Sequence, residues 1–388
     1  MSDAVIVAYG RSPIGRAFKG SLIEMRPDDL ASKVVDHVLG SLPDEVRQDG
    51  IDDLICGCGL PGGEQGFNLG RIISILSRLD APGTTITRYC ASSLQATRMA
   101  FHAISAGEGS CYIIAGVECV SRYGAGFTDP PEAQNPLLKP GNTEGYPDIY
   151  IAMGNTAENV ARREHVTRQE MDEYALRSQQ RTAKAIADGF YDGEIIPIDR
   201  ADGTVITKDD SPRPTTTLEG LAALKPAFSE DGLVTAGNSC PLNDGAAALV
   251  VLSKERASAL GVTPLARIVA TGLCQLEPEY MGLGPVESTR RALASAHMSI
   301  DDIDLVEMNE AFAAQIIPST RELGIDPFDD DRFNVHGGAI ALGHPFGMTG
   351  ARLIGTLVRS LHERDKQTGL ATLCVGGGMG MAMIVERL

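Results

Sequence analysis

The sequence predicts an α/β protein made of two similar halves with a long insertion. Three observations carry this prediction: short apolar segments alternate with amphipathic ones, their order occurs twice, and a stretch rich in Pro, Gly, Asp and Thr interrupts them. Strands that alternate with helices are typical of parallel sheets covered by helices on both faces. We expect an N-terminal half over residues 1–258, including an inserted loop domain at about 119–245, and a C-terminal half over 259–388.

The first half begins with a short buried strand at Ala4–Val7, followed by a helix at Pro27–Leu42 whose apolar residues recur at helical spacing. Another strand is expected at Ile51–Cys56. The next three segments are expected to be a strand, an amphipathic helix and a strand, in the ranges Thr84–Tyr89, Ala91–Ala106 and Cys111–Ala115.

The same order of segments returns downstream. A helix is expected at Gly284–Ala296, and Ile300–Val306 leads into a strand much as Ile51–Ile55 does. A strand, a helix and a strand then follow, in the ranges Arg332–Val335, Gly347–Leu361 and Ala371–Val375. The repetition favours one α/β unit used twice over a chance similarity of two unrelated stretches.

The stretch between the halves, from about Ser121 to Ala236, contains a clear helical pattern around Arg168–Asp188. It carries too much pattern for a flexible linker, so we expect a folded insertion. An apolar strand at Gly245–Leu252 follows it.

Composition excludes several classes of function. Lys and Arg number 34 against 51 Asp and Glu, a formal net charge of −17, which disfavours a surface that tracks nucleic acid phosphates. A few cations and backbone N–H groups can still bind a small anion locally. No apolar run approaches the roughly 20 residues of a membrane span. The eight cysteines lack the spacing of a disulfide scaffold, and the N-terminus lacks a signal peptide, so we expect a reduced, cytoplasmic protein.

Cys90 lies where an apolar strand changes into a helix of small residues. The N-terminal end of a helix stabilises a thiolate and lowers the pKa of the thiol, which suits a nucleophile. The alternative is a buried structural cysteine.

The segment 334–350 contains two histidines, His336 and His344, among five glycines, in the second-half turn that corresponds to the turn of Cys90. An imidazole fixed in such a turn suits a general base. A metal site is disfavoured, because no third ligand follows at metal-binding spacing.

Two further strand ends carry reactive or polar groups. Cys374 begins a glycine-rich run to Gly380, whose backbone N–H groups can hold an oxyanion beside a second thiol. Asn309 closes the strand Ile303–Met308, at the edge where open α/β sheets bind ligands, although it can also be a helix cap. Because all these residues fall at corresponding strand ends, we expect one shared pocket.

At these residues the sequence resembles the thiolase family, which breaks or forms the carbon–carbon bond of 3-oxoacyl-CoA thioesters. The resemblance runs from Ala4 to Arg387 and is closest to bacterial degradative members, including those that act on steroid side chains. It implies a five-layered α-β-α-β-α fold, a loop domain over the CoA, and a homodimer or homotetramer. It also implies coenzyme A as co-substrate, with CoA thioesters as partners and no tightly bound cofactor.

The resemblance implies a role for each site residue. Cys90 is similar to the acylated nucleophile, His344 to the base that activates it, and Cys374 to the thiol that moves a proton on the acetyl carbon. Asn309 resembles the residue that positions a water in one oxyanion hole, with an N–H from His344. The backbone N–H groups of Cys90 and Gly376 resemble the other hole.

The resemblance also implies substrate or CoA contacts at Ala152, Met153, Ala236, Gly237, Cys240 and Phe312. Three positions depart from the family pattern: Thr87 replaces an Asn, Ala152 replaces the His of short-chain biosynthetic members, and Cys240 replaces a Ser near the CoA. Without the imidazole at Ala152 the pocket should be larger and more apolar, so we expect acyl chains longer than acetoacetyl.

Other functions are compatible with parts of the pattern. They are an acetoacetyl-CoA-specific acetyltransferase, a 3-oxoacyl synthase-like condensing enzyme, a non-catalytic binder of acyl-CoA or lipid, and an α/β protein with structural cysteines. The condensing enzymes lack a second reactive Cys in a Cys-x-Gly-Gly-Gly-x-Gly terminus, whereas this chain has Cys374 there.

Overall fold

A mixed sheet runs through the molecule and joins its two halves. The computed structural model describes residues 2–48, 50–123, 132 and 134–388. Strands β4 (Gly83–Ile86), β3 (Asp53–Cys58), β5 (Cys111–Cys119), β8 (Asn243–Ser253) and β1 (Ala4–Arg11) form the first half in that order, with β2 (Gly15–Arg16) beside β8. The order continues through β9 (Ala266–Gln275), β12 (Met379–Arg387), β11 (Thr368–Val375) and β10 (Leu305–Met308).

The halves meet at β1 and β9, which pair over two residues, Val5 with Arg267 and Ile6 with Ala266. The expectation of parallel sheets is only partly correct. Strand β3 is parallel to β4 and β5, and β10 is parallel to β11, but the remaining pairs are antiparallel. The reason is local for β11 and β12, because a tight turn of glycines connects them and only an antiparallel pair can be closed that way.

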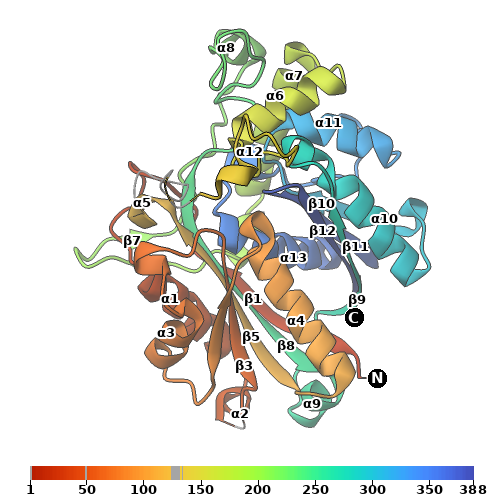
Figure 1. Cartoon of the computed structure of the whole chain (residues 1–388). Helices are drawn as coiled ribbons and strands as arrows, with labels where there is room; N and C mark the ends of the chain where they lie inside the picture. Colours follow the sequence, from red (N-terminus) through yellow and green to blue (C-terminus); the bar gives the residue numbers. More distant parts are fainter. Residues whose placement is uncertain (1, 49, 124–131, 133) are drawn as a thin grey trace.

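The helices form three layers around these strands (Figure 1). Helices α1 (Pro27–Gly40) and α3 (Leu69–Leu76) cover the outer face of the first half, and α10 (Gly284–Ala296) and α11 (Ala313–Glu322) that of the second. Helices α4 (Ser92–Ala106) and α13 (Phe346–Glu363) lie between the halves. This is the expected α-β-α-β-α arrangement.

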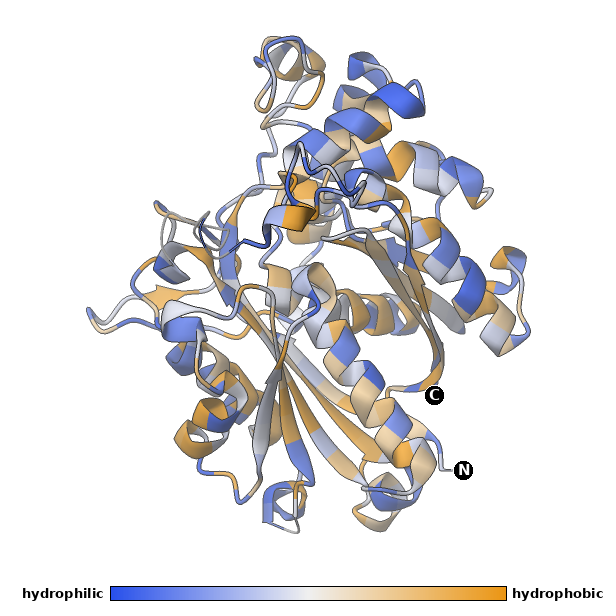
Figure 2. Ribbon diagram, in the orientation of Figure 1, coloured by the Kyte–Doolittle hydropathy of each residue, from blue (hydrophilic) through white to orange (hydrophobic). Residues whose placement is uncertain are grey.

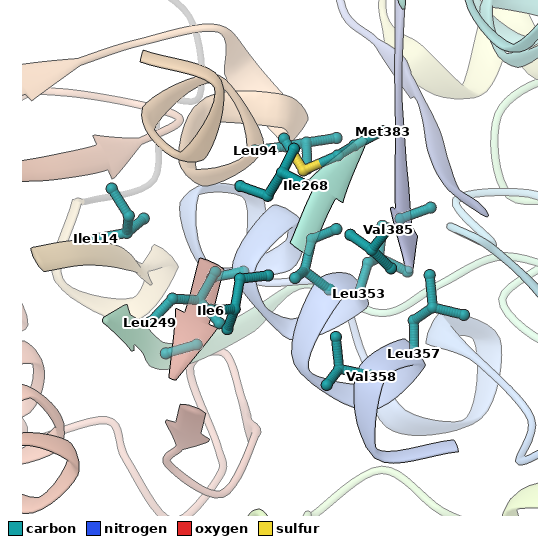
Figure 3. Close-up of a cluster of buried hydrophobic side chains, with 14 of the residues drawn as sticks. Ile6, Leu94, Ile114, Leu249, Ile268, Leu353, Leu357, Val358, Met383 and Val385 are labelled. Carbon is teal, nitrogen blue, oxygen red and sulfur yellow. The ribbon is translucent and has the colours of Figure 1, made fainter. Parts of the chain in front are cut away.

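Side chains alternate between these layers along each strand. On β12, Met381, Met383 and Val385 face the middle layer, whereas Ala382 and Ile384 face the outer one. The period of two is that of a strand buried on both faces. Figure 3 shows the middle core, where side chains of both halves surround α13, and Figure 2 shows hydrophilic residues on the outward faces of the peripheral helices.

The segment between β5 and β8 packs over one end of both halves. It contains α5 (Val120–Tyr123), α6 (Met153–Arg163), α7 (Arg168–Ala187) and α8 (Leu218–Ala222), with the short pair β6 (Ile198–Asp199) and β7 (Val205–Ile206). Helix α7 agrees with the expected one, and Thr167 and Glu170 cap its start reciprocally. Residues 124–131 and 133 of the expected insertion lie outside the described residues.

Outside this segment, the described residues also form the short helices α2 (Asp44–Gln48), α9 (Lys254–Ala259) and α12 (Ala339–Leu342).

Two predicted strands are wrong or too long. Arg332–Val335 makes only an isolated bridge, Val306 with Phe333, because Asn334 adopts a φ of 42° that turns the chain out of the sheet. The strand predicted at Thr84–Tyr89 ends at Ile86, and Tyr89, with a φ of 44°, begins a 3₁₀ turn.

Over the described ranges, no helix combines the length and apolar character needed to cross a bilayer. In the same ranges, no group of three or more His, Cys, Asp and Glu side chains is arranged to hold a metal ion.

Candidate active site

The nucleophile candidate Cys90 sits in the 3₁₀ turn Tyr89–Ala91, just before α4. Ser92 holds this turn: its hydroxyl accepts a hydrogen bond from the Arg88 backbone N–H at 2.9 Å and donates one to the Tyr89 carbonyl at 2.7 Å. Cys90 as a whole residue is partly exposed, although its thiol is buried. The backbone N–H of Gly376 hydrogen-bonds to it. The structure therefore brings the thiol of Cys90 to the glycine turn that follows Cys374.

The expected lowering of the Cys90 pKa is not found. Burial raises the pKa of this thiol well above its ordinary value, the neighbouring thiols of Cys374 and Cys240 raise it further, and the Gly376 N–H only partly offsets them. Helix α4 begins two residues after Cys90, so its dipole does not overcome the loss of water. Cys90 is consequently a thiol at neutral pH and needs a base to become a nucleophile.

His344 is the base candidate, and its hydrogen bonds fix its tautomer. Nδ1 lies 2.7 Å from the Thr349 hydroxyl, which donates its own hydrogen to the Pro345 carbonyl at 2.8 Å. The hydroxyl must therefore accept from Nδ1–H, which leaves the lone pair on Nε2. Asn309 Nδ2 lies 3.3 Å from that nitrogen. Burial lowers the pKa of His344 to about 3, with a further decrease from Arg352, so the imidazole is neutral.

The turn that carries His344 depends on Gly343. Its φ is +117°, and a Cβ there would lie 2.6 Å from the Asn243 side chain. That side chain accepts a hydrogen bond from the His344 backbone N–H at 3.0 Å. The other histidine of the motif is not part of this arrangement, because His336 stacks on Phe190 with ring centroids 3.6 Å apart.

Cys374 is fully buried at the end of β11 and faces the outer layer of the second half. Its sulfur lies 3.1 Å from Gln315 Nε2 and 3.3 Å from Oε1. Burial raises the pKa of this thiol to about 11, and the Gln315 amide lowers it. Sequence reasoning missed Gln315, because one glutamine in an amphipathic helix gives no signal until α11 and β11 are known to pack together.

Asn309 lies after β10, with its backbone N–H bonded to the Thr372 carbonyl at 3.0 Å. Its side chain is fully buried, and Oδ1 meets no donor among the described residues. An acceptor in this state can take a hydrogen bond from water or substrate.

Two buried carboxylates that sequence reasoning also missed hold the loops of the site. Glu118 accepts hydrogen bonds from the backbone N–H groups of Gly59 and Gly347 at 2.7 and 2.9 Å, which ties the start of α13 to the first half. Glu310 accepts hydrogen bonds from Tyr174 and Ser178 of α7 at 2.7 and 2.6 Å. The signal in the sequence that could have found both carboxylates is an acidic residue within a mostly apolar segment.

A cleft of about 890 Å³ opens beside Cys240. Three cations line it, Arg16, Lys19 and Arg213, together with the apolar Phe228 and Leu224. Three of the predicted CoA contacts also line it, namely Ala236, Gly237 and Cys240. The Cys240 thiol is close enough to Cys374 for their charges to interact, so one wall of the cleft is next to the buried Cys374 thiol.

The other three predicted contacts lie outside the cleft lining. A Cβ added to Gly376 would lie 3.6 Å from the Met153 sulfur, so Met153 is beside the glycine turn. Ala152 precedes α6 in extended conformation. Phe312 packs edge-on against Phe228, with ring centroids 6.1 Å apart, and so supports the wall of the cleft.

Comparison with known proteins gives consistent matches over nearly the whole chain. The family model described as "Thiolase, N-terminal domain" matches residues 4–255, and "Thiolase, C-terminal domain" matches residues 262–387. A "3-ketoacyl-CoA thiolase" of Bacillus subtilis is 42% identical, and a "3-oxoadipyl-CoA/3-oxo-5,6-dehydrosuberyl-CoA thiolase" of Escherichia coli is 43% identical, each with full coverage of both chains. The crystal structure of the Bacillus anthracis acetyl-CoA acetyltransferase superposes with a TM-score of 0.89 at 37% identity, covering 100% of this chain and 99% of that one.

Proposed function

The chain belongs to the thiolase family, and from that premise we propose how its residues divide the work of the reaction. The protein is an acyltransferase that cleaves 3-oxoacyl-CoA with CoA, giving acetyl-CoA and a shortened acyl-CoA. The observation that carries the division of roles is a neutral imidazole of fixed tautomer beside Asn309, together with the close approach of the Cys90 thiol to Cys374 and to the Gly376 N–H.

In the first half-reaction His344 Nε2 takes the proton of Cys90, and the Cys90 sulfur attacks the 3-oxo carbon. The 3-oxo oxygen gains negative charge, which the backbone N–H groups of Cys90 and Gly376 stabilise in one oxyanion hole. The bond between C2 and C3 then breaks, and its electron pair forms the enolate of acetyl-CoA, whose oxygen is stabilised by Nε2–H and a water on Asn309 in the other hole. Cys374 gives its proton to that enolate and becomes a thiolate, while the shortened acyl group stays on Cys90 as a thioester.

In the second half-reaction the thiol of CoA gives its proton to the Cys374 thiolate and its sulfur attacks the Cys90 thioester. The thioester carbonyl oxygen stays in the hole formed by the backbone N–H groups of Cys90 and Gly376, which stabilise the negative charge that it gains during this attack. Cys90 leaves as a thiolate and takes its proton back from His344. Each group therefore returns to its starting state after one turnover.

We assign the CoA arm to the cleft of about 890 Å³ beside Cys240. Arg16, Lys19 and Arg213 give it local positive charge in a chain of net charge −17, which suits the phosphates of CoA. No tightly bound cofactor is proposed, and CoA acts as co-substrate.

The acyl chain is proposed to be longer than acetoacetyl, because Ala152 removes an imidazole from the pocket. Each buried methylene contributes roughly 0.8 kcal/mol at most, so neighbouring chain lengths should differ modestly. The test is thiolysis of a 3-oxoacyl-CoA series, with acetyl-CoA and the shortened acyl-CoA identified by mass spectrometry. A kcat/KM that is greatest for acetoacetyl-CoA and falls sharply beyond it would favour the short-chain alternative, and absence of both products with every substrate would refute thiolase activity.

We propose that two copies of the chain associate through the sheet edge at β4. This strand pairs only with β3 among the described strands, and the apolar side chains of Phe67, Ile75 and Leu76 beside it are 99%, 58% and 44% exposed. Light scattering should give a dimer or tetramer mass, and Phe67→Asp should shift it toward the monomer. A monomeric wild-type chain would refute this interface.

Because the reaction needs free thiols, we place the protein in a reducing, cytoplasmic compartment.

A further inference from the structure

The Gln315 amide is the polar side chain that faces Cys374. Both of its heavy atoms are within reach of the sulfur, Nε2 at 3.1 Å and Oε1 at 3.3 Å. Gln315 is 1% exposed and Cys374 is 0% exposed. Apart from the thiols of Cys90 and Cys240, the side chains around the sulfur belong to the apolar cluster on the outer face of the second half. The Gln315 amide is therefore the neutral hydrogen-bonding group placed to stabilise a charge on this sulfur.

Packing holds Gln315 in this place. It is the third residue of α11, and its backbone N–H donates to the Phe312 carbonyl at 3.2 Å. A Cβ on Gly282 would lie 2.8 Å from Gln315 Cβ, so the glycine lets the neighbouring segment approach the base of this side chain closely. A long polar side chain that is buried from its base to its amide has few other rotamers available.

An amide offers what each form of a thiol requires. A thiol has an S–H to donate, which Oε1 can accept, whereas a thiolate can only accept, and the NH₂ group can donate to it. In the proposed reaction Cys374 is a thiol before it protonates the enolate and a thiolate afterwards, once in every turnover.

We propose that Gln315 is a further catalytic residue, whose carbonyl oxygen orients the Cys374 thiol and whose NH₂ group stabilises the thiolate formed by proton transfer. This assignment rests on the proposed function of Cys374. It adds a residue that acts on the proton transfer at the acetyl carbon and not on acylation of Cys90.

The other groups near the sulfur do not supply this stabilisation. The titratable side chains that face Cys374 are the thiols of Cys90 and Cys240, and a thiolate on either opposes a second negative charge. Burial alone raises the pKa of Cys374, and among the described side chains the Gln315 amide is the one that acts in the opposite direction. Loss of its donor should therefore lower the thiolate population by nearly the same factor at every pH well below the pKa of about 11.

The experiment measures exchange of the C2 hydrogens of acetyl-CoA in D₂O, by mass spectrometry, from pH 6.5 to 10. Two variants of similar shape are used: Gln315→Met lacks donor and acceptor, and Gln315→Glu keeps acceptors but replaces the donor with a carboxylate. The control is Ser319→Ala in the same helix, because the Ser319 hydroxyl bonds to the Gly282 carbonyl at 3.3 Å without touching Cys374.

We expect exchange at pH 7.5 to fall about 10- to 100-fold in Gln315→Met, the loss typical of a hydrogen bond to a charged group. We expect a larger fall in Gln315→Glu, a fold-loss in each variant that stays nearly constant from pH 6.5 to 10, and acylation of Cys90 within about threefold of the wild type. Ser319→Ala should exchange at the wild-type rate.

A loss of Cys90 acylation as large as the loss of exchange, or Gln315→Glu as the mildest variant, indicates a structural role and overturns the proposal. So does wild-type exchange in Gln315→Met. Circular dichroism checks folding, and if Gln315→Met does not fold, the loss of exchange compared with the loss of acylation in Gln315→Glu decides by the same criteria. A wild-type protein without thiolysis or exchange refutes the proposed function itself, whereas an active wild type with unaffected variants refutes only the role of Gln315.

Discussion

Replacing Thr349 by Val tests whether one hydroxyl sets the chemistry of His344. The two side chains have nearly the same shape, but Val cannot accept from Nδ1–H, which is buried and now meets the Thr349 hydroxyl at 2.7 Å. The Pro345 carbonyl that loses the hydroxyl keeps the backbone N–H of residue 349 at 3.0 Å. The substitution therefore leaves one group unpaired, the imidazole N–H.

The magnitude follows from the charge on the imidazole. A hydrogen bond from a neutral donor contributes about 1 kcal/mol and one from a charged donor about 1.5–3 kcal/mol, so the bond strengthens by about 0.5–2 kcal/mol when His344 takes the Cys90 proton. At 1.36 kcal/mol for each factor of ten, acylation should slow about 2- to 30-fold. The unpaired donor should also lower the free energy of unfolding by about 1–3 kcal/mol.

The assay is the rate of acyl transfer to Cys90 from 3-oxoacyl-CoA, followed by quenching and intact-mass spectrometry, together with urea denaturation. Thr349→Ser is the matched control, because it keeps the hydroxyl and should acylate within about threefold of the wild type. Wild-type acylation in Thr349→Val, or equal losses in Thr349→Val and Thr349→Ser, would show that the hydroxyl does not fix the tautomer.

Three further predictions concern the separate parts of the site. Cys374→Ser should lose carbon–carbon cleavage and keep exchange of acyl groups between Cys90 and CoA, whereas His344→Ala should lose both activities. Equal loss of the two activities in Cys374→Ser argues against separate roles for Cys374 and His344. Burial holds the pKa of His344 near 3, so the base stays unprotonated as pH falls through 6.5. The pH profile of kcat/KM should therefore show no decrease between pH 7 and pH 6, and a decrease there that titrates with His344 contradicts a buried neutral base. Arg213→Gln should raise the KM for CoA about two- to fivefold and leave kcat within about twofold, because an exposed charge contributes little binding energy. An unchanged KM would place the CoA phosphates elsewhere.

The residues of the site that the sequence identified share a position in the chain. Cys90, His344, Cys374 and Asn309 each lie at the end of a predicted strand or between a strand and a helix, where local pattern is enough to find them. Their juxtaposition followed from the repetition of the two halves. The family and the α/β thiolase fold are confirmed by the matches to known proteins, whereas the domain boundaries and the residue roles stay predictions.

The features that sequence reasoning missed depend on contacts between segments that are distant in the chain. Gln315 and Cys374 are 59 residues apart and meet only because α11 packs against β11. The pKa of Cys90 was predicted in the wrong direction, because a helix start is visible in sequence but the loss of water around the thiol is not. The antiparallel pairs were missed for a similar reason, since strand order does not follow from alternation of strands and helices.

The most direct test of the proposed reaction is the mass of the protein after it meets 3-oxoacyl-CoA without free CoA. We expect a wild-type mass increased by the shortened acyl group, located on the peptide of Cys90, and loss of that increase when CoA is added, with shortened acyl-CoA as product. In Cys90→Ala the increase should be absent. No adduct on the wild type, or an adduct that persists in Cys90→Ala, would contradict a reaction that passes through a Cys90 thioester.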